Sequence, residues 1–103
     1  MAFWGIELQP GKPYTQFFDK ALGKLHIFKA NLGVTTTEHV SRTVVQCKIG
    51  SNNPIILCSF RQFTKESCSI DIDFVEDVVF EVIGTASVHL AGSYLGNGHN
   101  TEE

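Results

Sequence analysis

Acidic side chains gather in one short stretch of the sequence. Six carboxylates fall within residues 66–81, and no Lys or Arg lies among them: Glu66, Asp71, Asp73, Glu76, Asp77 and Glu81. Such a cluster could bind a divalent cation, solvate an outward face, or dock a Lys- and Arg-rich protein. Calcium is disfavoured, because the stretch lacks the loop of alternating ligands and its glycine. The other two interpretations stay open.

Charge is divided along the chain. All eight Lys and Arg lie between Lys12 and Lys65, whereas residues 66–103 carry eight of the eleven carboxylates. The formal net charge of −3 therefore hides a basic part followed by an acidic one. The acidic part attracts basic proteins and repels phosphate, and the cations are spread singly over several segments. The pattern predicts no direct nucleic-acid partner.

Residues that could support catalysis are scattered. The sequence contains no nucleophile elbow, phosphate-binding loop or dinucleotide-binding motif. None of its four histidines has metal-ligand spacing from a cysteine; they are His26, His39, His89 and His99. We therefore expect no catalytic residue, no metal site and no cofactor in this domain.

The cysteines have two interpretations. Cys47, Cys58 and Cys68 form no CxxC pair, their number is odd, and each lies in an apolar segment. Buried, reduced thiols of an intracellular protein are the first interpretation. A Cys47–Cys58 disulfide is the second, in which these two residues face each other across a hairpin.

The elements that carry these residues are predicted to be strands. Alternation with a period of two dominates, and no segment shows the period of a helix. Gly, Pro and Asn turns separate eight predicted strands, which cover 3–8, 14–18, 24–32, 42–49, 55–63, 68–74, 78–83 and 87–95. This spacing predicts an all-β sandwich or barrel. We expect one domain over 1–95, the start of a linker over 96–103, and neither a targeting signal nor a membrane span.

Two of the strands are apolar on both sides. The segments VVFEVI (78–83) and PIILCSF (54–60) do not alternate, although a strand with one solvated face should do so. A single two-layer domain leaves its outer faces wet. We therefore predict that a second copy of the chain covers some of these outer faces.

Three longer segments carry a family resemblance. They are FWGIELQPGKPY (3–14), GKLHIFKANLG (23–33) and VVFEVIGTASVHLAGSYL (78–95). Together they resemble the nucleoplasmin-like domain, most closely the version at the N-terminus of plant nuclear FK506-binding-type prolyl isomerases. Plant histone deacetylase-type nuclear proteins share the opening motif. The resemblance covers residues 2–95.

The resemblance implies an eight-stranded jelly roll that forms a pentameric ring, in some members stacked into a decamer. It implies histone binding, a role in nucleosome assembly and a nuclear or nucleolar location, with isomerase activity confined to a separate C-terminal domain. Within that frame we assign histone contact to the acidic face of Glu66, Asp71, Asp73, Glu76 and Asp77. We assign the subunit interface to Phe3, Trp4, Val79, Glu81 and Ile83.

Two other functions are considered. The domain could serve only as an oligomerisation scaffold, with histones held by an acidic tract beyond Glu103. It could also resemble the deacetylase-type proteins in activity, since His26 lies where they have a histidine proposed as catalytic, and Asp71 or Asp73 lies near their acidic position. No zinc ligand set or nucleophile accompanies these residues, so we do not carry that activity over.

Overall fold

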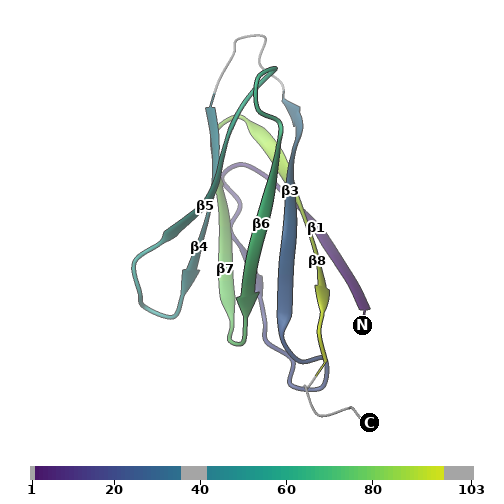
Figure 1. The fold of residues 1–103 in the computed structure, drawn as a ribbon. Helices are drawn as coiled ribbons and strands as arrows, with labels where there is room; N and C mark the ends of the chain where they lie inside the picture. The colour runs from purple at the N-terminus through teal and green to yellow at the C-terminus, as the bar shows by residue number, and fades with distance from the viewer. Residues whose placement is uncertain (1, 36–41, 97–103) are drawn as a thin grey trace.

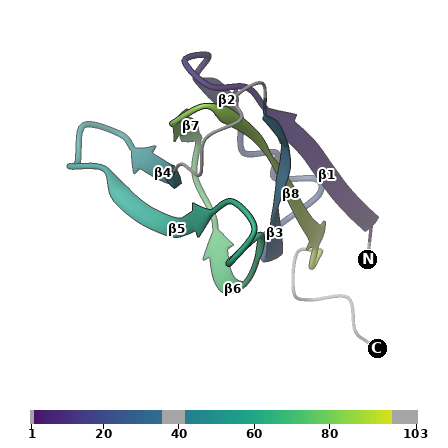
Figure 2. The same cartoon turned by 90° about the horizontal axis from the view of Figure 1, so that it is seen from above.

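The chain folds as a sandwich of two antiparallel sheets. The computed structural model describes residues 2–35 and 42–96, and the strands in this part of the chain form two layers (Figure 1, Figure 2). Sheet A has the order β1-β8-β3-β6, and sheet B has the order β2-β7-β4-β5. This arrangement confirms the predicted all-β, jelly-roll architecture.

Sheet A contains β1 (Ala2–Leu8), β8 (Ala86–Tyr94), β3 (Leu25–Thr35) and β6 (Ser67–Phe74). Sheet B contains β2 (Tyr14–Gln16), β7 (Val78–Ile83), β4 (Arg42–Ile49) and β5 (Ile55–Arg61). The edge strands β5 and β6 also contact each other, so the two sheets meet along one side of the sandwich.

The core lies between the sheets and is filled by the inward side of each strand. Aromatic rings occupy its centre: Phe80 lies 5.6 Å from Phe74 edge to face and 6.3 Å from Trp4, measured between ring centroids. Such tilted aromatic pairs contribute beyond the area that they bury. Aliphatic residues such as Ile27 and Val88 complete the core and are fully buried.

A glutamine connects the two sheets beside this core. The indole Nε1 of Trp4 donates a hydrogen bond to Oε1 of Gln16 at 3.2 Å, and Nε2 of Gln16 donates to the Tyr94 hydroxyl at 3.0 Å. Trp4 and Tyr94 belong to sheet A, whereas Gln16 ends β2 of sheet B. The Gln16 side chain therefore joins sheet B to sheet A through hydrogen bonds.

Several strand ends differ from the prediction, most of them by one residue. We expected β2 to reach 18, but it ends at Gln16, because its partner β7 begins opposite it at Val78. We expected β3 to end at Leu32, but it continues to Thr35, because β8 extends to Ala86 and offers a partner. We expected β5 to reach 63, but it ends at Arg61, where the Lys65 amide donates to the Arg61 carbonyl at 2.7 Å and closes a turn. Residues 36–41, between β3 and β4, and the predicted linker apart from Gly96 lie outside the described residues.

Glycine is required where β3 and β8 approach each other. A Cβ built on Gly92 would lie 2.3 Å from the His26 carbonyl oxygen, closer than real Cβ contacts allow. β3 and β8 can pair at the observed separation only if residue 92 has no side chain. The outward side of β3 at His26 is therefore fixed relative to β8.

Candidate functional site

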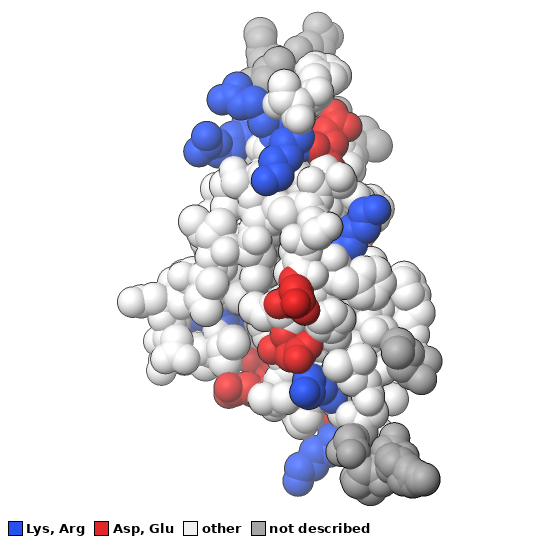
Figure 3. Space-filling view, in the orientation of Figure 1, with Lys and Arg blue, Asp and Glu red and all other residues white. Residues whose placement is uncertain are grey.

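The predicted acidic residues form a row along one edge of sheet A. Asp71 and Asp73 lie on the outward side of β6, while Phe74 on the same strand points into the core. Glu66 precedes the strand, and Glu76 follows it in the turn to β7. Figure 3 shows carboxylates in the middle of this face, below a group of Lys and Arg side chains at the upper end. The row therefore follows the length of the strand.

A histidine lies between the two aspartates. Nδ1 of His26 is 2.6 Å from Oδ1 of Asp73, and its Nε2 is 3.6 Å from Oδ1 of Asp71. The β3–β6 register places His26 opposite Asp73, which explains the contact. Lys24 approaches the other oxygen of Asp73 at 3.8 Å. Asp73 is thus partly neutralised, whereas the Asp71 side chain is 95% exposed.

The other predicted carboxylates differ in whether they already accept a hydrogen bond within the chain. Glu66 accepts a hydrogen bond from the Phe63 amide at 2.7 Å, and Asp77 accepts one from the Phe18 amide at 2.7 Å. Glu66 therefore holds a local turn, and Asp77 holds the β2–β3 connection against the β6–β7 turn. Glu76 has no such partner among the described residues. The freest negative charges in the row are those of Asp71 and Glu76.

The outer face of sheet B has a different character. Val44 lies opposite Ile83 across the β4–β7 pair, and Val79 lies further along β7 on the same side. Ile83 is 53% exposed, and Ile56 on the neighbouring edge strand β5 is 64% exposed. We call these four residues the apolar face. Its position agrees with the prediction that β7 is apolar on both sides.

One charged residue lies within the apolar face. Glu81 is half-buried, and its Oε1 accepts a hydrogen bond from Nε2 of Gln46 at 3.2 Å. Gln46 lies directly opposite on β4. The carboxylate is therefore partnered within its own chain.

The two aromatic residues at the start of the chain point in opposite directions. Phe3 is 76% exposed, whereas Trp4 is buried in the core of its own subunit. Both lie on β1, which is the edge strand of sheet A opposite β6. In both ribbon views β1 lies on the other side of the molecule from β4 and β5 (Figure 1, Figure 2). Of the pair, only Phe3 offers its ring to a neighbour.

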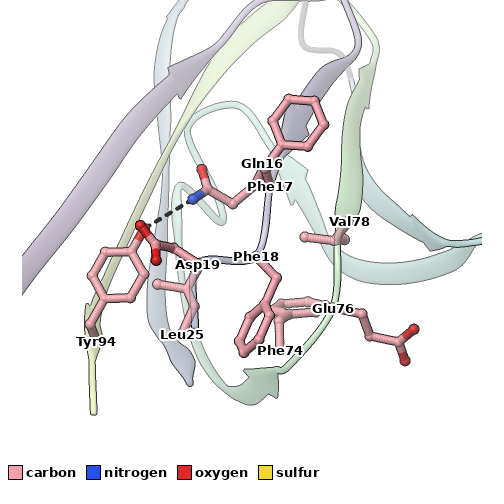
Figure 4. A pocket seen from close by; sticks show the side chains of 9 residues that line it. All are labelled: Gln16, Phe17, Phe18, Asp19, Leu25, Phe74, Glu76, Val78 and Tyr94. Carbon is pink, nitrogen blue, oxygen red and sulfur yellow. Dashed lines mark hydrogen bonds between the residues drawn. The ribbon is translucent and has the colours of Figure 1, made fainter. Parts of the chain in front are cut away.

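A small hollow lies near the acidic end of the sandwich. Its cavity volume is about 10 Å³, and residues of both sheets and of the β2–β3 connection line it (Figure 4). Phe18 and Phe74 lie together on one side of it, and the Gln16–Tyr94 hydrogen bond crosses the other. A cavity of this volume has room for about one water molecule and not for a larger ligand.

The cysteines are free, as in the first interpretation, and Cys47 and Cys58 do not face each other as the second interpretation required. A register shift in the β4–β5 pair places Cys47 opposite Ile55 and Cys58 opposite Val45. Burial raises the pKa of the Cys47 thiol. Burial, and then the neighbouring Cys68 thiol, raise the pKa of Cys58 to about 12. The thiol next to Cys58 is therefore that of Cys68 on β6, a contact that no sequence pattern predicted.

Neither a metal-binding cluster nor a membrane-spanning helix is present among the described residues. No group of three or more His, Cys, Asp or Glu side chains is arranged there to hold a metal ion. No helix within residues 2–35 and 42–96 is long and apolar enough to cross a membrane.

The fold is similar to that of two solved Drosophila domains. The crystal structure of the Drosophila NLP core, described as giving insight into pentamer formation and histone binding, matches with a TM-score of 0.74 at 24% identity, covering 90% of this chain and 97% of that one. The nucleoplasmin-like N-terminal domain of Drosophila FKBP39 matches with a TM-score of 0.70 at 20% identity, covering 99% and 92%. At these identities the likeness establishes the fold.

Two proteins are similar in sequence. Peptidyl-prolyl cis-trans isomerase FKBP53 of Arabidopsis thaliana is 39% identical over 95 residues, which are 89% of this chain and 20% of that protein. FK506-binding protein 4 of Rhizopus delemar is 31% identical over 103 residues, 98% of this chain and 26% of that protein. The chain thus spans a fifth to a quarter of these relatives. The model of the nucleoplasmin-like domain matches residues 3–95, and the chain therefore belongs to the nucleoplasmin-like domain family.

Proposed function

We propose that this domain is a ring-forming histone-binding module. The observation that carries the proposal is the contrast between the outer faces of one sandwich, in a chain of the nucleoplasmin-like family. Sheet A presents Asp71 and Asp73 to solvent, whereas sheet B presents Ile83 and Ile56. A charged face suits a basic partner, and an apolar face suits a second copy of the chain.

The ring would close through two different surfaces of each subunit. A ring of identical chains needs a heterologous contact, in which one patch of a subunit meets another patch of the next. The apolar face of sheet B, with Glu81 inside it, supplies one patch. Phe3 on β1, on the other side of the subunit, supplies the second; Trp4 would support it from within the core. A pentamer is the assembly named for the Drosophila NLP core, and we propose the same number of copies here. Two such rings could stack into a decamer.

Histone binding would depend on repetition. An exposed ion pair contributes about 0–1 kcal/mol, so the few free carboxylates of one subunit hold a basic protein only weakly. Five copies around a ring present the row of Asp71 and Glu76, supported by Glu66, Asp73 and Asp77, as one multivalent surface. The domain would act in the nucleus, where histones are found.

A pull-down of core histones tests this function. We expect binding at about 0.1 M salt and its loss at about 1 M, because the Debye length shrinks from about 10 to about 3 Å. Asp71→Asn with Glu76→Gln should weaken binding. Glu7→Gln, on β1 at the opposite edge of sheet A from β6, is the matched control for Asp71→Asn alone. Absence of binding at low salt, or equal losses in these two single variants, would refute the proposal.

One observation favours a second form of the function. Lys24 and His26 already contact Asp73, so the acidity of the row is reduced within the domain itself. The ring would then serve as a scaffold, with an acidic tract beyond Glu103 holding the histones and an isomerase domain further along the parent protein. Adding the downstream segment separates the two forms: a core that competes for histones as well as the extended chain rules out the scaffold.

A further inference from the structure

Cations gather at one end of the sandwich, where the acidic row begins at Glu66. Arg42 begins β4 and lies directly opposite Arg61, which ends β5. Lys65 pairs with Arg61 across the turn that follows. All three side chains are exposed, and none forms a salt bridge with another described residue. Figure 3 shows Lys and Arg side chains grouped at this end of the molecule. We call this surface the basic tip.

An aromatic ring projects from the middle of the basic tip. Phe63 is 72% exposed and has a positive φ of 71°, a conformation that bulky side chains rarely adopt. Surrounding hydrogen bonds impose it: the Phe63 amide donates to Glu66, and the Thr64 and Lys65 amides both donate to the Arg61 carbonyl. The ring is therefore held exposed in the turn that joins Arg61 to Lys65.

The turn concentrates several unfavourable features. Like charges directly opposite each other in a sheet destabilise it, as for Arg42 and Arg61. The left-handed Phe63 carries backbone strain. Oε1 of Gln62 is buried and has no hydrogen-bond partner among the described residues. Such features persist where a ligand or a function offsets them. A bound anion would remove the repulsion between the arginines.

The side chains of the basic tip limit the class of ligand that it can bind. Arginine binds carboxylate or phosphate through paired hydrogen bonds, and an exposed ring adds an apolar contact. A long polyanion such as a nucleic acid needs many phosphate contacts, typically about six to ten in proteins that bind it tightly. It would also run along β6, where Asp71 and Asp73 repel it. A short acidic peptide can occupy the tip alone.

We propose that Arg42, Arg61 and Lys65, together with Phe63, form a docking site for a short acidic peptide segment that also carries an apolar side chain. The arginines and the lysine bind its carboxylates, and the phenylalanine ring covers its apolar residue. This site adjoins the proposed histone-binding row at Glu66, but it takes a ligand of the opposite charge, so either proposal can fail without the other.

Fluorescence anisotropy with a labelled oligoglutamate peptide carrying one leucine tests the site on the whole chain. We expect binding that weakens as salt is raised, and none with an oligoglutamine peptide of the same length. Arg42→Gln with Arg61→Gln should weaken it about tenfold, since each exposed ion pair contributes modestly. Lys20→Gln with Lys48→Gln, at the other end of the sandwich, removes the same charge and should leave the affinity unchanged.

Phe63→Gly separates a binding role from a structural one. Glycine adopts a positive φ without strain, so the thermal midpoint should stay equal or rise while the peptide affinity falls. No binding by the wild type, or equal losses in the arginine and lysine pairs, overturns the proposal. Tighter binding of a single-stranded oligothymidylate of equal charge overturns it in favour of nucleic acid. Unchanged affinity of the glycine variant removes Phe63 from the site.

Discussion

The apolar face of sheet B offers the sharpest test of the proposed ring. Replacing Ile56 and Ile83 by aspartate places two carboxylates where a neighbouring subunit would exclude water. Both side chains are more than half exposed in the single chain, at 64% and 53%. The substitutions therefore disturb the core of the subunit little. Their main effect should fall on association.

The magnitude follows from the exposed fractions. Full burial of an isoleucine is worth about 1.5–3 kcal/mol, so a neighbour that covers the exposed 64% of Ile56 and 53% of Ile83 gains about 1–2 kcal/mol from each. Losing both weakens each subunit contact by about 2–4 kcal/mol, or about 30- to 1,000-fold. Burying two unpaired carboxylates adds several kcal/mol more.

Light scattering coupled to size exclusion measures the outcome. A closed ring of five copies of the 11.4 kDa chain has a mass of about 57 kDa. We expect this mass for the wild type at micromolar concentration and the mass of one chain for the double variant. Leu22→Asp with Val75→Asp changes two exposed apolar turn residues in the same way and should leave the ring intact. A wild type of 11.4 kDa, or a double variant that stays in the ring, would refute the reasoning.

Three further predictions concern the subunit itself. Phe80→Ala, at a fully buried position, should lower the free energy of unfolding by about 3–5 kcal/mol in a urea titration. Gln16→Leu leaves the Trp4 indole N–H and the Tyr94 hydroxyl without partners, and should cost about 1–3 kcal/mol in the same titration. Because the pKa of Cys58 is raised to about 12, its thiolate is scarce at pH 8, and mass spectrometry should find it unmodified after brief iodoacetamide treatment of the native protein.

Alternation along the chain was sufficient to predict most of the strands. In β6 every second residue is apolar, so the sequence alone places Asp71 and Asp73 outward and Phe74 inward, and the structure confirms this. The bounds of β7 and β4 also follow from their apolar runs and flanking turns. Local patterns are reliable here because one face of each strand must be buried.

Contacts between strands could not be predicted in the same way. The pairing of His26 with Asp73 depends on the β3–β6 register, and a bulge next to this pair shifts it. A shift in the β4–β5 pair likewise moves Cys58 away from Cys47. A bulge adds one residue to a strand and so changes which side chains face each other across the pair. The alternation of apolar and polar residues does not show where such a bulge lies. The basic tip could not be predicted because the pairing of Arg42 with Arg61 depends on the register of β4 and β5, which shifts between Val45 and Gln46.

The proposed ring and the proposed histone binding make a joint prediction. The Ile56→Asp and Ile83→Asp variant keeps every carboxylate of the acidic row and adds two more negative charges. Electrostatic attraction alone would therefore make it bind histones more tightly than the wild type. Multivalency predicts the opposite, because a dissociated subunit presents only its own few carboxylates. Weaker histone binding by this more acidic variant, in the same low-salt pull-down, could come only from loss of the assembly. Equal or tighter binding by a dissociated subunit would show that one acidic row is sufficient and that the ring is not needed.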